Sequence, residues 1–264
     1  KYFGICTMMV TMPGLPMFGH GQIEGFTEKY GMEYSRAYWD EEPDYNLIKR
    51  HEREIFPLLH KKYLFAGVDN FLLYDFFDDY GKVNEDVFAY SNRYDEKRAL
   101  VIYNNRNSQT KGWIKSSVAY STKNESDGKR MLIQKTLTDG LNLNTADNYF
   151  TIFKDNTTNL EYIRHNRELF EKGFFIDLGS YDYHVFIDFQ EIRDNEKRHY
   201  ASLASYLGGR GVSNIYDALN EVFLQPIHGI LSELINPDML KRFTEAYDNI
   251  FLNKQKTASD KLLD

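Results

Sequence analysis

Residues 71–104, FLLYDFFDDYGKVNEDVFAYSNRYDEKRALVIYN, carry the pattern that decides the fold class. Residues 71–77 are a short, mostly apolar run, and residues 86–92 and 98–104 flank the polar stretch 93–97 like the arms of a hairpin. Aromatic and β-branched residues of the kind that fill these runs favour strands over helices. This stretch therefore predicts antiparallel β-structure.

The strand pattern continues downstream and then gives way to a helical one. Short apolar and aromatic runs recur between polar loops at residues 113–120, 131–137, 149–154, 160–165, 174–178 and 183–189. Such spacing is typical of a β-sandwich or a similar antiparallel layer, so we assign residues 67–196 to a β-rich domain. From residue 197 the apolar spacing turns helical, which predicts a helical tail over residues 197–264 with helices at 200–207, 213–224, 227–235 and 238–252.

Upstream of the hairpin, residues 1–66 follow the order strand, loop, helix. Residues 2–18 are nearly all apolar, with Pro13 and Pro16 near their end, as in a strand that is buried on both faces of a parallel sheet. A long loop over residues 19–43 is dense in glycine, aromatic and charged residues. Asp44 can cap a helix that begins near Leu47, and Pro57 should kink or end that helix. We therefore predict one β/α unit here.

The composition of the 264 residues excludes several classes of protein. Hydrophobic residues make up 42% of the chain, and the formal net charge is -7. No apolar run approaches the ~20 residues that a membrane-spanning helix needs, and the negative charge argues against recognition of nucleic acid through its phosphates. One cysteine, Cys6, excludes an internal disulfide framework. We therefore expect neither a membrane nor a nucleic acid among the partners.

No motif indicates a cofactor or a metal ion. The glycines of residues 19–25 fail the dinucleotide-binding pattern, because three residues instead of two separate the last pair. His51 begins a stretch similar to the zinc-binding helix motif, but Ile55 stands where the second histidine should be. We therefore expect no bound metal and no cofactor.

The polar residues that could bind a ligand gather in the loop after the first predicted strand. Ligand sites of parallel β/α folds lie beyond the carboxyl ends of the strands, and carboxylates among aromatic rings are what a carbohydrate site uses. The alternative is that these aromatic residues only pack against their neighbours. The candidates for the rim of a substrate site are His20, Gln22, Glu24, Tyr30, Tyr34 and Trp39.

Residues 13–22, PGLPMFGHGQ, followed by Glu24 and Gly25, resemble the segment that closes the catalytic barrel of the α-amylase family, glycoside hydrolase family 13. The glycines, the proline and the amide of that segment match at Gly14, Pro16, Gly21 and Gln22, whereas Ile23 stands where the family usually has a glutamate. The stretch that runs from residues 28–34 to residues 40–41 is similar to a stretch found in a group of long bacterial members of this family. The resemblance implies an α+β chain: the last strand, loop and helix of a (β/α)8 barrel over 1–66, the β-sandwich-like domain over 67–196 and the helical tail over 197–264.

The resemblance also implies a function. The chain would be the C-terminal fragment of an enzyme that acts on α-glucosidic bonds, packed on an upstream catalytic domain and reaching an α-glucan only through that missing barrel. Family members cleave with a pair of carboxylates and a stabilising aspartate, and no segment here matches the motifs that carry them, so we assign no catalytic residue. The alternative is a non-catalytic carbohydrate-binding or structural module, with Trp113, Tyr181 and Tyr183 as exposed aromatic platforms.

Overall fold

The computed structural model describes residues 1–28, 36–123 and 129–260. The chain forms two compact units, Lys1–Ile215 and Tyr216–Asp264. The second unit is built from helix α8 (Ile215–Leu234), which begins at the last residue of the first unit, and helix α9 (Pro237–Asp260). No helix in the described part of the chain is both long enough and apolar enough to cross a membrane.

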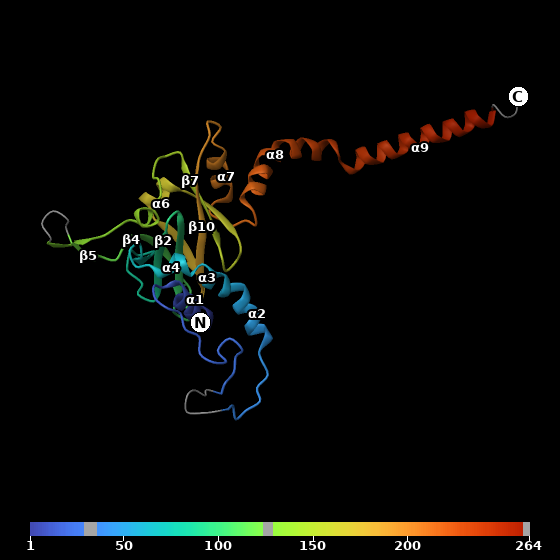
Figure 1. Cartoon of the computed structure of the whole chain (residues 1–264). Helices are drawn as coiled ribbons and strands as arrows, with labels where there is room; N and C mark the ends of the chain where they lie inside the picture. Colours follow the sequence, from blue (N-terminus) through green and yellow to red (C-terminus); the bar gives the residue numbers. More distant parts are fainter. Residues whose placement is uncertain (29–35, 124–128, 261–264) are drawn as a thin grey trace. The chain divides into compact units, whose positions relative to one another are not determined.

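The first unit is organised by one antiparallel sheet of eight strands, in the order β8-β7-β10-β3-β2-β1-β4-β9 (Figure 1). Its strands are β1 (Leu72–Asp78), β2 (Val87–Tyr94), β3 (Lys97–Asn104), β4 (Thr110–Ser117), β7 (Tyr149–Asp155), β8 (Glu161–His165), β9 (Phe174–Leu178) and β10 (Tyr183–Arg193). Strands β5 (Tyr120–Lys123) and β6 (Arg130–Ile133) pair separately. The predicted hairpin is confirmed, because β2 and β3 pair from Val87↔Asn104 to Tyr94↔Lys97.

The sheet curls around a single apolar core. Phe153 of β7 and Phe174 of β9 belong to strands near opposite ends of the sheet, yet their ring centroids are only 5.9 Å apart. Helices α5 (Leu137–Leu141) and α6 (Asn166–Glu171) add Leu137 and Leu169 to this core. The antiparallel β-rich region predicted from the sequence therefore takes the form of one curled sheet.

The opposite face of the sheet is covered by helices from the first 66 residues. These helices are α1 (Tyr2–Thr11), α2 (Tyr45–Glu54), α3 (Phe56–His60) and α4 (Lys62–Ala66). Side chains from α1, α3 and α4, such as Val10, Leu58 and Phe65, share a second buried core with Tyr90 and Val101 of the sheet. The helical layer and the sheet are therefore held together by one hydrophobic interface, and the compact units separate at residue 215 and not at residues 66 or 196.

The predicted strand over residues 2–18 is wrong, because this segment begins as helix α1 and continues without helix or strand after Thr11. An uninterrupted apolar run of this length does not distinguish a strand from a buried helix. The buried positions Phe3, Cys6 and Val10 recur at helical spacing, and a Cβ atom on Gly4 would lie 2.2 Å from the ring of Tyr103. Helix α1 therefore packs directly on the sheet, and the structure shows no (β/α)8 unit in the described residues.

The predicted helices that begin near Leu47, at residues 200–207 and at residues 238–252 are confirmed, whereas the two predicted helices at residues 213–224 and 227–235 form one continuous helix, α8. Asp44 caps α2 by accepting hydrogen bonds from the backbone N–H groups of Asn46 and Leu47. Pro57 lies in the first turn of α3, where its missing N–H costs nothing. In the predicted tail, α7 (His199–Leu207) belongs to the first unit, and α8 and α9 follow.

Candidate functional site

A pocket lies at the seam where the two edges of the curled sheet approach each other. Strands β8 and β9 are consecutive in the chain and are joined by α6, but they form opposite edges of the sheet. The pocket has a volume of about 840 Å³, within the range of small-molecule sites. We call it the seam pocket and define it by lining residues from β8, β9, β10 and the segment after α7: Tyr162, Arg164, Phe174, His184, Phe186 and Gly209.

Arg164 is the central charged residue of the seam pocket. Its guanidinium carbon lies 5.6 Å from the ring centroid of Phe174 and 5.7 Å from that of Tyr162, near the outer limit of a cation–π contact. Its Nη1 donates to the carbonyl of Ile163 at 2.9 Å and its Nη2 to that of Gly209 at 3.0 Å. Burial lowers the pKa of the Arg164 guanidinium. Arg164 therefore lies in surroundings that make its charged form less stable than it is in water.

Two glycines after α7 allow the backbone to approach Arg164 and Tyr162 closely. Gly209 has φ +87, and a Cβ atom there would lie 3.4 Å from Nη2 of Arg164. A Cβ atom on Gly211 would lie 2.7 Å from the ring of Tyr162. The sequence does contain a signal for this close approach of the backbone. It is the stretch Gly-Gly-Arg-Gly at residues 208–211, which directly follows a predicted helix.

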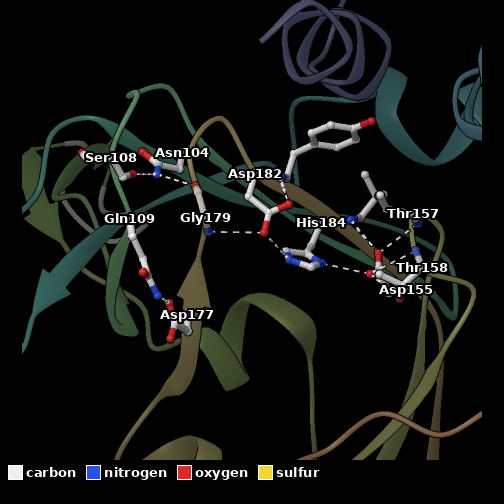
Figure 2. Close-up of polar contacts among 12 residues, drawn as sticks. Asn104, Ser108, Gln109, Asp155, Thr157, Thr158, Asp177, Gly179, Asp182 and His184 are labelled. Carbon is white, nitrogen blue, oxygen red and sulfur yellow. Dashed lines mark hydrogen bonds and ion pairs between the residues drawn. The ribbon is translucent and has the colours of Figure 1, made fainter.

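In the same pocket, His184 is held between two carboxylates (Figure 2). Nδ1 of His184 lies 2.9 Å from Oδ2 of Asp155, and Nε2 lies 3.5 Å from Oδ2 of Asp182. The ring also stacks on Phe186, with an interplanar angle of 2°. Asp155 is fully buried and accepts further hydrogen bonds, from the backbone N–H of Thr157 and the hydroxyl of Thr158.

The charges of this cluster fix its protonation states. Burial alone would lower the pKa of His184, but the hydrogen bonds and charges of Asp155 and Asp182 outweigh burial and raise it to about 9. Burial would raise the pKa of Asp155, but the contact with His184 and the backbone donors lower it. The His184 contact likewise lowers the pKa of Asp182. At neutral pH the cluster is therefore an imidazolium between two carboxylates, which leaves neither acid suited to donate a proton.

The remaining acidic residues around the pocket already have partners. Asp177 accepts from Nε2 of Gln109 at 2.9 Å, Glu168 pairs with Lys172 at 2.9 Å, and Asp194 accepts from backbone N–H groups in the first turn of α7. Within the described ranges, no carboxylate lies within 4 Å of the Arg164 nitrogens, and Glu168 acts on it only at longer range. Burying an ion costs several kcal/mol, and two carbonyls with distant rings offset only part of that. Arg164 is thus a half-buried cation with no counter-ion within 4 Å among the described residues.

The four predicted rim residues that the structure describes, His20, Gln22, Glu24 and Trp39, do not line the seam pocket. His20 and Trp39 are exposed, and Gln22 and Glu24 are half-buried. Oε1 of Gln22 accepts from the backbone N–H of Gly19 at 3.0 Å. Tyr30 and Tyr34 lie outside the described residues. Their role at a substrate rim stays a prediction. In the parts of the chain that the structure describes, no group of three or more His, Cys, Asp or Glu residues is placed to hold a metal ion.

The three predicted aromatic platforms have different surroundings. Tyr183 is only 5% exposed and donates its hydroxyl hydrogen to Glu54, so its prediction as an exposed platform is wrong. Tyr181 is half-buried beside the amine of Lys1. Trp113 is half-buried on β4 and packs against Phe175 of β9, with ring centroids 5.0 Å apart. Trp113 and Phe175 therefore form an accessible pair next to the seam pocket.

The similarity that comparison with known proteins finds is structural and distant. No family model matches this chain, and no curated protein matches it. Among solved structures, the α-amylase of Geobacillus thermoleovorans in complex with acarbose aligns with 71% of this chain at 14% sequence identity and a TM-score of 0.42. The aligned part is 32% of that α-amylase chain, so this chain spans about a third of it.

Proposed function

We propose that this chain is the C-terminal portion of an α-amylase-type protein that acts on α-glucosidic bonds, and that it braces the catalytic domain without supplying a catalytic carboxylate. The proposal is carried by the position of the segment that resembles the barrel-closing motif, residues 13–22. This segment lies between α1 and α2, and α1, α3 and α4 share a buried core with the sheet. In this proposal, the curled sheet holds that segment and its flanking helices in place for the rest of the barrel.

The electrostatics of the buried acids support a non-catalytic role. A retaining glycosidase needs one carboxyl group with a raised pKa to protonate the leaving group. The pKa of Asp155 and that of Asp182 are lowered instead. Burial would raise the pKa of Glu54, but hydrogen bonds from Tyr183, Arg53 and Arg50 lower it. These three acids are stabilised in the ionised form, which is the wrong state for a general acid.

The test is to sequence the natural coding region that precedes Lys1 and then to express the longer protein. We expect a barrel with the two catalytic carboxylates and the stabilising aspartate, starch-degrading activity in the longer protein and none in residues 1–264 alone. As a control, replacing the upstream nucleophilic carboxylate with a neutral side chain should abolish the activity of the longer protein. An unrelated upstream region, or turnover by the purified chain that disappears in Glu24→Gln, would overturn the proposal.

A glucan-binding module is the second candidate, and the Trp113–Phe175 pair favours it. Phe175 points away from the inner core, since its neighbours Phe174 and Ile176 belong to that core, and it is 41% exposed. A sugar could stack on such a pair. The bracing role predicts binding of maltoheptaose no tighter than about millimolar in calorimetric titration. Micromolar binding that is lost in Trp113→Ala and kept in Trp39→Ala, the other tryptophan, would favour the binding module instead.

A further inference from the structure

We propose that the seam pocket is a binding site for a small phosphorylated sugar, whose phosphate pairs with Arg164 and whose ring lies against the aromatic wall of the pocket. The phosphate is inferred from the pocket itself, and the choice of a sugar as the attached ring rests on the proposed function. None of residues 13–25, which carry the resemblance to the barrel segment, lines this pocket, whereas Trp113 and Phe175 lie at its edge.

The first observation is the unmet charge of Arg164. A guanidinium has five N–H donors, and the described contacts of Arg164 use Nη1 and Nη2 once each, on backbone carbonyls. No carboxylate of the described residues pairs with it, and Glu168 is already paired with Lys172. A planar guanidinium with free donors matches the oxygens of a phosphate in a two-point contact. Arg164 therefore lacks the partner that a phosphate would supply.

The second observation is the shape and lining of the pocket. Its volume of about 840 Å³ accommodates a sugar phosphate, and Tyr162, Phe174 and Phe186 supply ring faces on its wall. Arg198 also lines the pocket, and its side chain forms no ion pair with any described residue. Four acids also line the pocket, and none of them lies within 4 Å of a nitrogen of Arg164 or Arg198: Asp147 is paired with Arg167, Glu168 with Lys172, Asp177 with Gln109 and Asp194 with the first turn of α7.

The third observation is that the pocket is built by rigid elements. Arg164 lies on β8, which pairs with β7 from Phe150↔His165 to Lys154↔Glu161. The Gly209 carbonyl fixes one side of the guanidinium, and the His184 cluster holds β10 against the loop that follows β7. A guanidinium that is held in place before the ligand arrives loses little conformational freedom on binding.

The test is calorimetric titration of the full chain with glucose 6-phosphate, glucose and inorganic phosphate, alongside thermal unfolding. We expect glucose 6-phosphate to bind best and to raise the melting temperature. Arg164→Met should weaken its binding by about 10- to 100-fold, as expected for the loss of a charged hydrogen-bonding partner. Without ligand, Arg164→Met should be about as stable as the wild type, because it removes a half-buried charge that has no counter-ion within 4 Å among the described residues.

Two further variants keep the test decisive. Arg193→Met makes the same change of charge at an exposed arginine outside the pocket, and its affinity should equal that of the wild type. Arg164→Lys keeps the charge but loses the planar fork, so its affinity should lie between those of the wild type and Arg164→Met.

Three results would overturn the proposal. Absence of binding by every phosphate probe, or equal binding by Arg164→Met and the wild type, would remove the anion site. Equal binding of glucose 6-phosphate and inorganic phosphate would remove the sugar from the proposal. None of these results depends on the coding region upstream of Lys1, so failure of this inference is distinguishable from failure of the proposed function.

Discussion

Tyr183 and His184 are neighbours on β10 that point to opposite faces of the sheet, and each anchors a cluster of buried charges. Tyr183 faces the helical layer, where its hydroxyl donates to Glu54 and accepts from Nη2 of Arg50 at 3.1 Å. His184 faces the inner core side and lies between Asp155 and Asp182. On the helical face a buried acid is neutralised by arginines, and on the pocket face a buried base is neutralised by acids.

The difference between the faces lies in what remains unpaired. On the helical face, Glu54 is 4% exposed, while Arg50 and Arg53 keep about half or more of their side-chain surface in water. Its charges are therefore satisfied by protein and solvent together. On the pocket face, the His184 cluster is also satisfied, but Arg164 in the same pocket is not. Because both faces belong to one sheet, this contrast points to the pocket face as the one that receives a ligand.

The largest expected effect is on the pocket face, at Asp155. Asp155→Ala leaves Nδ1 of His184 and the backbone N–H groups of Thr157 and Val185 without their acceptor, all in buried surroundings. We expect a loss of roughly 3–5 kcal/mol in the free energy of unfolding. Urea unfolding followed by tryptophan fluorescence measures it, because both tryptophans lie in the first unit.

The matched control is Asp177→Ala, which removes an exposed acid that accepts a hydrogen bond from Gln109. It should change the free energy of unfolding by no more than about 0.5 kcal/mol. If Asp155→Ala cost no more than Asp177→Ala, the cluster would not hold the pocket face together.

The pH dependence of stability sharpens the comparison further. The pKa of His184 is raised from 6.5 to about 9 in the folded chain, so its stabilising contribution is complete below pH 6.5 and is lost as the pH rises through 9. The shift corresponds to roughly 3 kcal/mol, since one pKa unit is about 1.4 kcal/mol. The pKa values of Asp155 and Asp182 are lowered, so their contribution is lost only as the pH falls below about 4.

Urea unfolding at pH 6 and at pH 10 tests this dependence. The wild type should lose stability between these two values, and His184→Gln should lose much less. An equal loss in both proteins would assign the dependence to another group.

The strands were largely predictable from the sequence because their signal is local. The pairing of β2 with β3 follows from two apolar runs and a short polar turn, and the predicted strand at residues 174–178 coincides with β9. Helix α1 was not predictable in the same way, since its apolar run has no polar face to reveal the helical period. Its place is fixed by contacts with residues distant in the sequence, such as the close approach of Gly4 to Tyr103 of β3 and the core that Val10 shares with Tyr90.

The seam pocket was not predictable because it depends on contacts between distant residues. The pattern of residues 160–165 predicts a strand that contains Arg164, but nothing in that pattern distinguishes Arg164 from other charged strand residues. What singles it out is the curl of the sheet, which brings Phe174 beside it, and the carbonyl of Gly209, 45 residues away. Pairing of β9 with β4, and not with β8, creates the open seam, and no local pattern encodes that choice.

The smallest expected effect is on the helical face, where Tyr183→Phe removes one hydroxyl and keeps the ring in the core. Glu54 retains the Nε of Arg50 at 3.1 Å and the guanidinium of Arg53, so no buried charge loses all its partners. We expect a loss of about 1–2 kcal/mol in the free energy of unfolding, the cost of one hydrogen bond to a charged group.

The loss should not depend on pH between pH 6 and pH 9. The pKa of Glu54 is lowered, so the contribution of Glu54 is constant at pH values above the usual pKa range of a glutamate. Urea unfolding at both pH values, for the wild type and Tyr183→Phe, separates the faces, because the raised pKa of His184, about 9, makes the pocket face depend on pH near the upper value, whereas the pKa of Glu54 is lowered. If the loss in the free energy of unfolding differed between the two pH values, the stability of the helical face would depend on the pocket face. The two faces could then no longer be treated as independent.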